Sequence, residues 1–129
     1  MTVEALQEAM LKQPQIKVET NHTFMNGIYA RQIIIPAGVV IVGAKHKTEH
    51  PYLISKGRCY IINNGKREYF EAPYSGITKP GSKRAIYAIE DTVFTTFHPT
   101  EDTDIKKIES EIIEPEGLQI ANNPAEAIK

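Results

Sequence analysis

From residue 16 to residue 97 the chain is a succession of short β-rich segments, cut at fairly regular intervals by turn residues. One such turn is Asn63-Asn64-Gly65, whose residue types tolerate the positive φ angles that a tight hairpin needs. Short strands at regular spacing predict an all-β sandwich or barrel. The candidate strands cover residues 23–35, 39–45, 51–55, 58–62, 66–72, 76–78, 84–88 and 92–98.

Helical patterns flank this β-rich region. Apolar residues recur every three or four positions from Val3 to Met10, and Pro14 ends the pattern, which predicts a helix within residues 1–14. Isoleucines repeat at helical spacing over 105–112 and predict a second, acidic helix within 99–114. We therefore expect a barrel over residues 15–98 with a helix at each end, and a surface tail over 115–129.

Composition excludes several classes of protein. The 129 residues suffice for about one domain, and a formal net charge of −1 gives no global field for nucleic acid. A single cysteine, Cys59, excludes an internal disulfide and a cysteine-based zinc cluster. No apolar run approaches the length of a membrane span, and Glu4 and Glu8 stand where a signal peptide would be basic or apolar. We expect a cytoplasmic protein that binds neither membrane nor nucleic acid.

Two of the four histidines follow the most apolar strand. If the turn after that strand keeps the alternation of side chains, His46, His50 and Tyr52 point to one side, into the mouth of a barrel. Two imidazoles in that position form a plausible metal-binding pair. Alternatively, they are a pair of exposed turn histidines among charged neighbours.

The residues around this pair resemble the first motif of the cupin superfamily. Gly57, reached through an apolar strand, looks like the glycine that closes this motif. The alignment then places His50 where the family has its Glu ligand, His46 where it has its second His, and Ala44 where it has its first.

A second cupin motif is similar to Lys79-Pro80-Gly81, and its register places Arg84 at the position of the last ligand histidine. The resemblance implies a mostly β, single-domain cupin-like jelly-roll barrel with a degenerate metal motif. Roughly residues 25–98, together with the acidic helix that follows, are also similar to small single-domain cupin-like proteins common in bacteriophages. This similarity implies a phage or prophage origin and a place in the host cytoplasm or on the virion.

His98 closes the last predicted strand and completes the set if that strand lies beside the one that follows His46. Three imidazoles would bind a divalent transition metal such as Zn, Fe, Mn or Ni and leave positions open. Glu49 is a candidate fourth ligand or outer partner, although the alternation of side chains points it away from His50. Taken alone, His98 is better explained as a strand-terminal histidine without a ligand.

Arg84 and Tyr52 are the candidate ligand-binding residues, because a guanidinium suits a carboxylate or a phosphate. Strand alternation places Arg84 inside the barrel, where it would need a partner such as Glu49, Glu68 or Glu71, or else a bound anion. A surface arginine and a packing tyrosine are the ordinary alternatives.

The sequence thus predicts a cupin-like protein that binds a metal, a small ligand or both, with catalysis undecided. The competing hypothesis is a non-catalytic assembly module that uses the barrel as a scaffold and the apolar face of the N-terminal helix for homodimer or virion contacts. In either case the apolar N-terminal helix, too short to be stable alone, predicts a homo-oligomer, most simply a dimer.

Overall fold

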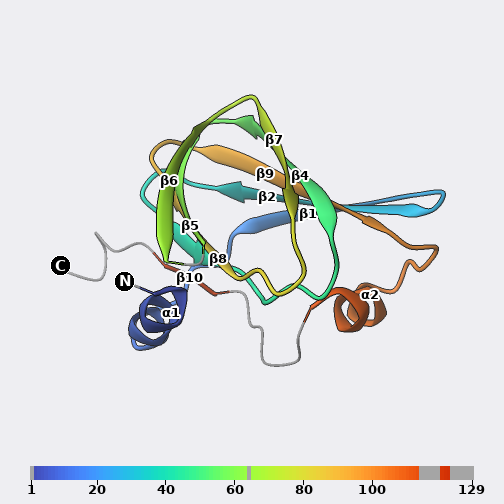
Figure 1. The fold of residues 1–129 in the computed structure, drawn as a ribbon, viewed down its shortest axis with the longest axis horizontal. Helices are drawn as coiled ribbons and strands as arrows, with labels where there is room; N and C mark the ends of the chain where they lie inside the picture. Colours follow the sequence, from blue (N-terminus) through green and yellow to red (C-terminus); the bar gives the residue numbers. More distant parts are fainter. Residues whose placement is uncertain (1, 64, 114–119, 123–129) are drawn as a thin grey trace.

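A computed structural model describes residues 2–63, 65–113 and 120–122 (Figure 1). Its strands form two five-stranded antiparallel sheets. Sheet A has the order β1 (Glu19–Met25), β2 (Ile28–Ile35), β9 (Thr92–Pro99), β4 (His50–Lys56), β7 (Tyr74–Thr78). Sheet B has the order β10 (Ile120–Asn122), β3 (Val40–Val42), β8 (Arg84–Ala88), β5 (Arg58–Asn63), β6 (Lys66–Glu71). The helices are α1 (Val3–Leu11) and α2 (Ile105–Ile112).

The two sheets face each other and enclose one apolar core, which confirms the predicted jelly-roll fold class. Ile54 and Phe94 come from sheet A, while Cys59 and Ile86 come from sheet B, and all four are almost completely buried. Burial raises the pKa of the Cys59 thiol to about 11, so this cysteine is an unreactive part of the core.

The prediction of a single strand over 23–35 was wrong, because a hairpin turn divides it into β1 and β2. The turn is Asn26-Gly27, and Gly27 has a φ of +81°, which glycine adopts without strain. Met25 pairs with Ile28 across it. The β1–β2 hairpin is the long projection on the right of Figure 1.

Part of the expected tail belongs to sheet B. Ile120, Ala121 and Asn122 pair with β3, and Ala121 is buried. Residues 120–122 are therefore a strand, which corrects the expectation of a surface tail there. The rest of the tail, 115–119 and 123–129, lies outside the described residues.

The apolar face of α1 packs on its own barrel. Val3 and Met10 are buried against Val40, Val42 and Ala85 of sheet B. This face is therefore not available for the dimer or virion contacts that motivated the assembly hypothesis, and the homodimer itself stays a prediction. No helix in the described part of the chain is long and apolar enough to cross a membrane.

The second helix, α2, lies at the other side of the barrel from α1 (Figure 1). Asp104 caps it by accepting hydrogen bonds from the backbone N–H groups of Lys106 and Lys107. Ile108 and Ile112 pack against Tyr29 of β2. This docking places the C-terminal end of α2 beside the loop that carries His46.

Candidate metal and ligand site

His50 and His98 meet because β4 and β9 are neighbours in sheet A. Tyr52 pairs with Thr96 in an antiparallel register, so the residues two positions outward, His50 and His98, come side by side. Their ring centroids are 4.3 Å apart, and each residue is 1% exposed. The strand order thus brings together two histidines that are 48 positions apart in the chain.

His46 joins them from the loop that precedes β4. Its N–H donates to the carbonyl of Ser82 at 2.9 Å, and its carbonyl accepts from the N–H of Gly81 at 2.7 Å. An isolated antiparallel β-bridge also pairs the backbone of His46 with that of Ile113. Its ring centroid lies 4.7 Å from that of His50. We call His46, His50 and His98 the histidine cluster.

Each imidazole in the cluster has one buried ring nitrogen without a hydrogen-bond partner among the described residues. These atoms are His46 Nδ1, His50 Nε2 and His98 Nδ1. The opposite nitrogen of His50, Nδ1, donates to the carbonyl of Thr48 at 3.1 Å, so Nε2 carries the free lone pair when the ring is neutral. His98 Nε2 bonds Thr96 Oγ1 at 2.9 Å.

The cluster is neutral at physiological pH. Burial and then the charge of Arg84 lower the pKa of His46 to about 3 and that of His50 to about 4. Burial and then the neighbouring His50 lower the pKa of His98 to about 3. Neutral imidazole is the form that binds metals, because its lone pair is available.

The cluster fits a metal in donor type and spacing, but its nitrogens do not converge. No group of three or more His, Cys, Asp or Glu side chains within the described residues is already arranged to hold an ion. Imidazoles sharing a metal at about 2.1 Å have ring centroids about 4.6 Å apart in octahedral and about 5.3 Å apart in tetrahedral geometry, whereas the observed separations are 4.3 and 4.7 Å. Binding would therefore need the rings to turn and to move slightly apart.

Glu49, the candidate fourth ligand, does not belong to the cluster. It is exposed and forms an ion pair with Lys79 at 3.0 Å. The alternation of side chains that directs His50 inward directs its neighbour outward. The expectation that Glu49 is a ligand or outer partner is therefore corrected.

Arg84 points into the barrel and is 6% exposed. Its Nη2 donates to Thr78 Oγ1 at 2.8 Å. The guanidinium carbon lies 5.0 Å from the ring centre of Tyr52 and 4.9 Å from that of Phe94. Burial lowers the pKa of Arg84 to about 10, so the group is still charged at pH 7.

None of the three expected carboxylates pairs with Arg84. Glu49 binds Lys79, Glu68 lies 3.6 Å from Lys66, and Glu71 is exposed. The ion pairs between described residues all involve other basic groups. Arg84 is thus a buried cation with no carboxylate partner in this part of the chain.

Three further residues shape the site and were not singled out from the sequence. Thr78 is buried, faces His50 across the β4–β7 pairing and accepts the hydrogen bond of Arg84. A Cβ on Gly76 would lie 2.6 Å from Tyr52 Oη, so glycine leaves room for that ring. Tyr29 stacks on His98, and its hydroxyl lies 2.6 Å from His22 Nδ1. The alternation of side chains along β7 could have predicted that Thr78 points inward. The contacts of Gly76 and Tyr29 could not be predicted in this way, because they depend on which strands are neighbours.

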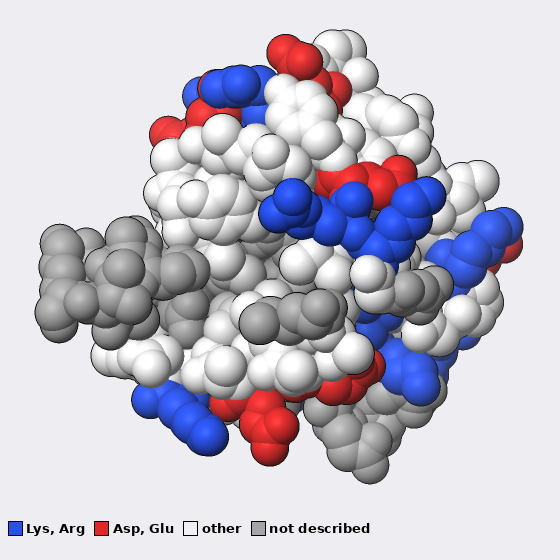
Figure 2. Space-filling model, turned by 60° about the vertical axis from the view of Figure 1, so that its left-hand side comes forward, with Lys and Arg blue, Asp and Glu red and all other residues white. Residues whose placement is uncertain are grey.

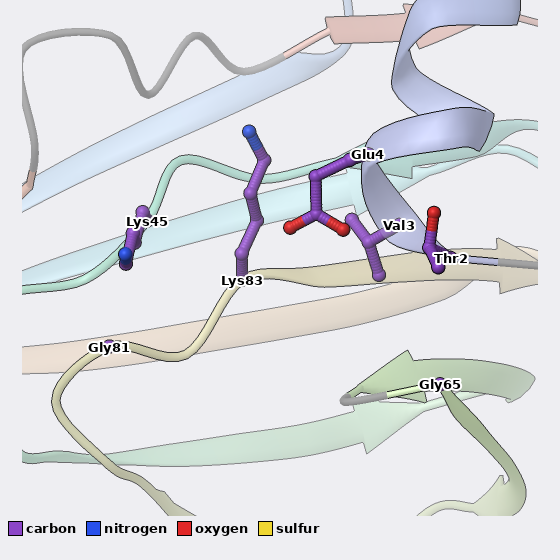
Figure 3. Close-up of a pocket in the computed structure, with 7 residues that line it drawn as sticks. All are labelled: Thr2, Val3, Glu4, Lys45, Gly65, Gly81 and Lys83. Carbon is purple, nitrogen blue, oxygen red and sulfur yellow. The ribbon is translucent and has the colours of Figure 1, made fainter.

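A separate pocket of about 310 Å³ opens on the surface beside α1 (Figure 3). It is lined by Thr2, Val3, Glu4, Lys45, Gly65, Gly81 and Lys83. Figure 2 shows basic side chains gathered across one face of the molecule, with carboxylates directly beside them. The pocket contains none of the clustered histidines and has mixed charge, so it is not the site described above.

Comparison with known proteins gives the fold. No family model and no curated protein matches the sequence. Among solved structures, a cupin superfamily protein from Desulfitobacterium hafniense matches with a TM-score of 0.57 and 10% identity over 67% of this chain and 80% of its own. The cupin domain of Schizosaccharomyces pombe Cnp3 matches with a TM-score of 0.57 and 16% identity over 78% and 71%.

A third match is salicylate 1,2-dioxygenase from Pseudoaminobacter salicylatoxidans, in a structure described as an adduct with gentisate. Its TM-score is 0.61 at 12% identity, over 88% of this chain but only 36% of the dioxygenase. The protein has the fold of the cupin superfamily, as the sequence motifs predicted. At these identities the likeness concerns the fold alone.

Proposed function

We propose that this protein binds one divalent transition metal per chain through His46, His50 and His98. The observation that carries the proposal is the presence in one cluster of three buried ring nitrogens for which the described part of the chain supplies no hydrogen-bond partner. A buried polar atom left unpaired costs about 1–3 kcal/mol. A metal that accepts all three lone pairs would remove that cost at each of them.

The donor set favours particular metals. Imidazole nitrogen suits Zn, Fe, Ni and Cu better than the hard, oxygen-preferring Ca and Mg. Three protein ligands would leave at least one coordination position open, as in metal sites that bind a substrate or water. When bound, the metal would supply Lewis-acid polarisation of whatever ligand occupies that position.

Two threonines orient the rings for this task. The carbonyl of Thr48 fixes the tautomer of His50, and Thr96 Oγ1 holds His98 through its Nε2 atom. Such outer contacts set the direction and basicity of metal-binding imidazoles. That a fold neighbour is described with gentisate adducts supports ligand binding in a barrel of this shape.

The test is metal uptake by tag-free protein. Metal-free chain is dialysed against Zn, Mn, Ni or Fe(II) and analysed for elements, and we expect close to one ion per chain. The double variant His46→Ala, His50→Ala should lose this uptake, while His22→Ala, which removes an exposed histidine outside the cluster, should keep it. Circular dichroism checks that each variant is folded. No uptake by the unmodified chain, or uptake unchanged in the double variant, would refute the proposal.

The assembly alternative relied on the apolar face of α1, which sheet B covers. The expected phage origin has no observation that favours it. We therefore propose the metal centre alone.

A further inference from the structure

We propose that the barrel interior binds a small carboxylate, held by the guanidinium of Arg84 and extending toward the histidine cluster. This deepens the proposed function, and it depends on that function only for the second contact of the ligand, at the metal. The anion site itself stands on the surroundings of Arg84.

Arg84 is a buried cation that lacks a compensating anion among the described residues. A buried cation without a compensating anion is costly, by several kcal/mol in real proteins. Arg84 is 6% exposed, and no described carboxylate lies within ion-pair distance of it. A bound anion would supply the charge that the described part of the protein does not.

The groups around the guanidinium of Arg84 leave room in its hydrogen-bonding pattern for a carboxylate. Tyr52 and Phe94 offer ring faces to the guanidinium carbon at 5.0 and 4.9 Å, and ring faces accept none of its in-plane N–H bonds. Thr78 accepts one of the five N–H donors of Arg84. The remaining donors of such a planar fork match the two oxygens of a carboxylate.

Arg84 lies next to the histidine cluster. Thr78, which anchors the guanidinium, is the cross-strand partner of His50. Arg84 therefore lies beside the cluster, close enough for its charge to act on His46 and His50. A metal ion there is repelled by the guanidinium, and an anion between the two relieves the repulsion. The metal and the carboxylate should accordingly strengthen each other's binding.

One guanidinium balances one carboxylate, and its planar fork matches the two carboxylate oxygens. The aromatic faces of Tyr52 and Phe94 beside it favour a monocarboxylate with an apolar body over phosphate. Benzoate is a suitable probe, because its ring can also contact the aromatic side chains of Tyr52 and Phe94.

Calorimetric titration of metal-free protein with benzoate tests the anion site independently of the metal. We expect binding that Arg84→Met weakens at least tenfold. Arg67→Met is the matched control, since Arg67 lies 4.8 Å over the ring of Tyr60 but is exposed, and its loss should leave the affinity unchanged. Arg84→Lys keeps the charge without the planar fork, so it should bind with intermediate affinity and provides a second folded variant.

Equal affinity in wild type and Arg84→Met would overturn the proposal, as would tighter binding of inorganic phosphate than of benzoate. Zn-loaded protein should bind benzoate more tightly than metal-free protein. Arg84-dependent benzoate binding by a chain that takes up no metal would overturn the metal centre and leave the anion site standing. Metal uptake by a chain that does not bind benzoate would overturn the anion site and leave the metal centre standing.

Discussion

Gly57 occupies a position where only glycine fits. Its φ is +96°, and a Cβ there would collide with the carbonyl oxygen of Asp91 and lie 2.8 Å from the Cα of Thr92. The contacts are with backbone, which cannot rotate away as a side-chain end can. The glycine that the cupin motif predicted is therefore required by close packing between the β4–β5 turn and the start of β9.

We predict that Gly57→Ala lowers the free energy of unfolding by about 2–4 kcal/mol, from backbone strain and overpacking together. Gly81→Ala is the control: its φ of +85° imposes similar strain, but no atom lies within 4 Å of the added Cβ. That variant should lose only about 1 kcal/mol. Urea denaturation measures both, and equal losses would contradict the role of the contacts with Asp91 and Thr92.

For single residues, the sequence predicted His46 and His50 as a candidate metal-binding pair and the inward direction of the Arg84 side chain. It could do so because motif register and strand alternation are local properties. It could not establish that His98 meets His50, since that contact depends on which strands are neighbours. Glu49, the candidate fourth ligand that alternation points away from His50, lies outside the site. The absence of a described carboxylate near Arg84 is likewise a property of the folded barrel and not of the local sequence.

Among the secondary-structure elements, α2 has a direct connection to the site. Its last turn binds the loop that carries His46. The carbonyl of Ile112 accepts a hydrogen bond from the N–H of Lys47 at 2.7 Å, and the carbonyl of Ser110 accepts one from Lys47 Nζ at 3.0 Å. Ile113 bridges to His46. The position of His46 therefore depends on the docking of this helix.

We predict that Asp104→Ala, which removes the N-cap of α2, lowers the free energy of unfolding by about 1 kcal/mol and weakens Zn binding. Thr2→Ala is the matched control, because Thr2 caps α1 through a 3.0 Å hydrogen bond and α1 packs on sheet B, away from the cluster. It should cost similar stability with unchanged Zn affinity. Equal Zn affinity in Asp104→Ala and wild type would show that α2 does not position His46.

Two elements differed from the sequence prediction for different reasons. The Asn26-Gly27 turn is a strong hairpin signal that the β-rich composition on both sides obscured. Strand β10 is only three residues long, Ile120–Asn122, and follows a stretch rich in turn residues. It is a strand because β3 offers it an edge to pair with, which no local pattern encodes.

For the whole molecule, the neutral cluster makes stability depend on pH. Each clustered histidine has a folded-state pKa below its ordinary value of 6.5, mainly through burial. The unfolded chain therefore binds these protons more readily than the folded one. The stability contributed by keeping the rings neutral is complete above pH 6.5 and is lost as pH falls toward the folded-state values of about 3 to 4.

We predict that the free energy of unfolding of the metal-free protein falls steadily between pH 6.5 and 4, with a limiting slope of about 1.4 kcal/mol per pH unit for each participating histidine. Urea denaturation at closely spaced pH values measures it.

His50→Gln should reduce the slope, because an amide takes up no proton, whereas His22→Ala should change it less, since His22 is exposed and its ring lies outside the cluster. Saturating Zn should steepen the dependence, because protons then compete with the metal for the same nitrogens. A free energy of unfolding that stays constant down to pH 4 would contradict the buried, neutral state of the cluster.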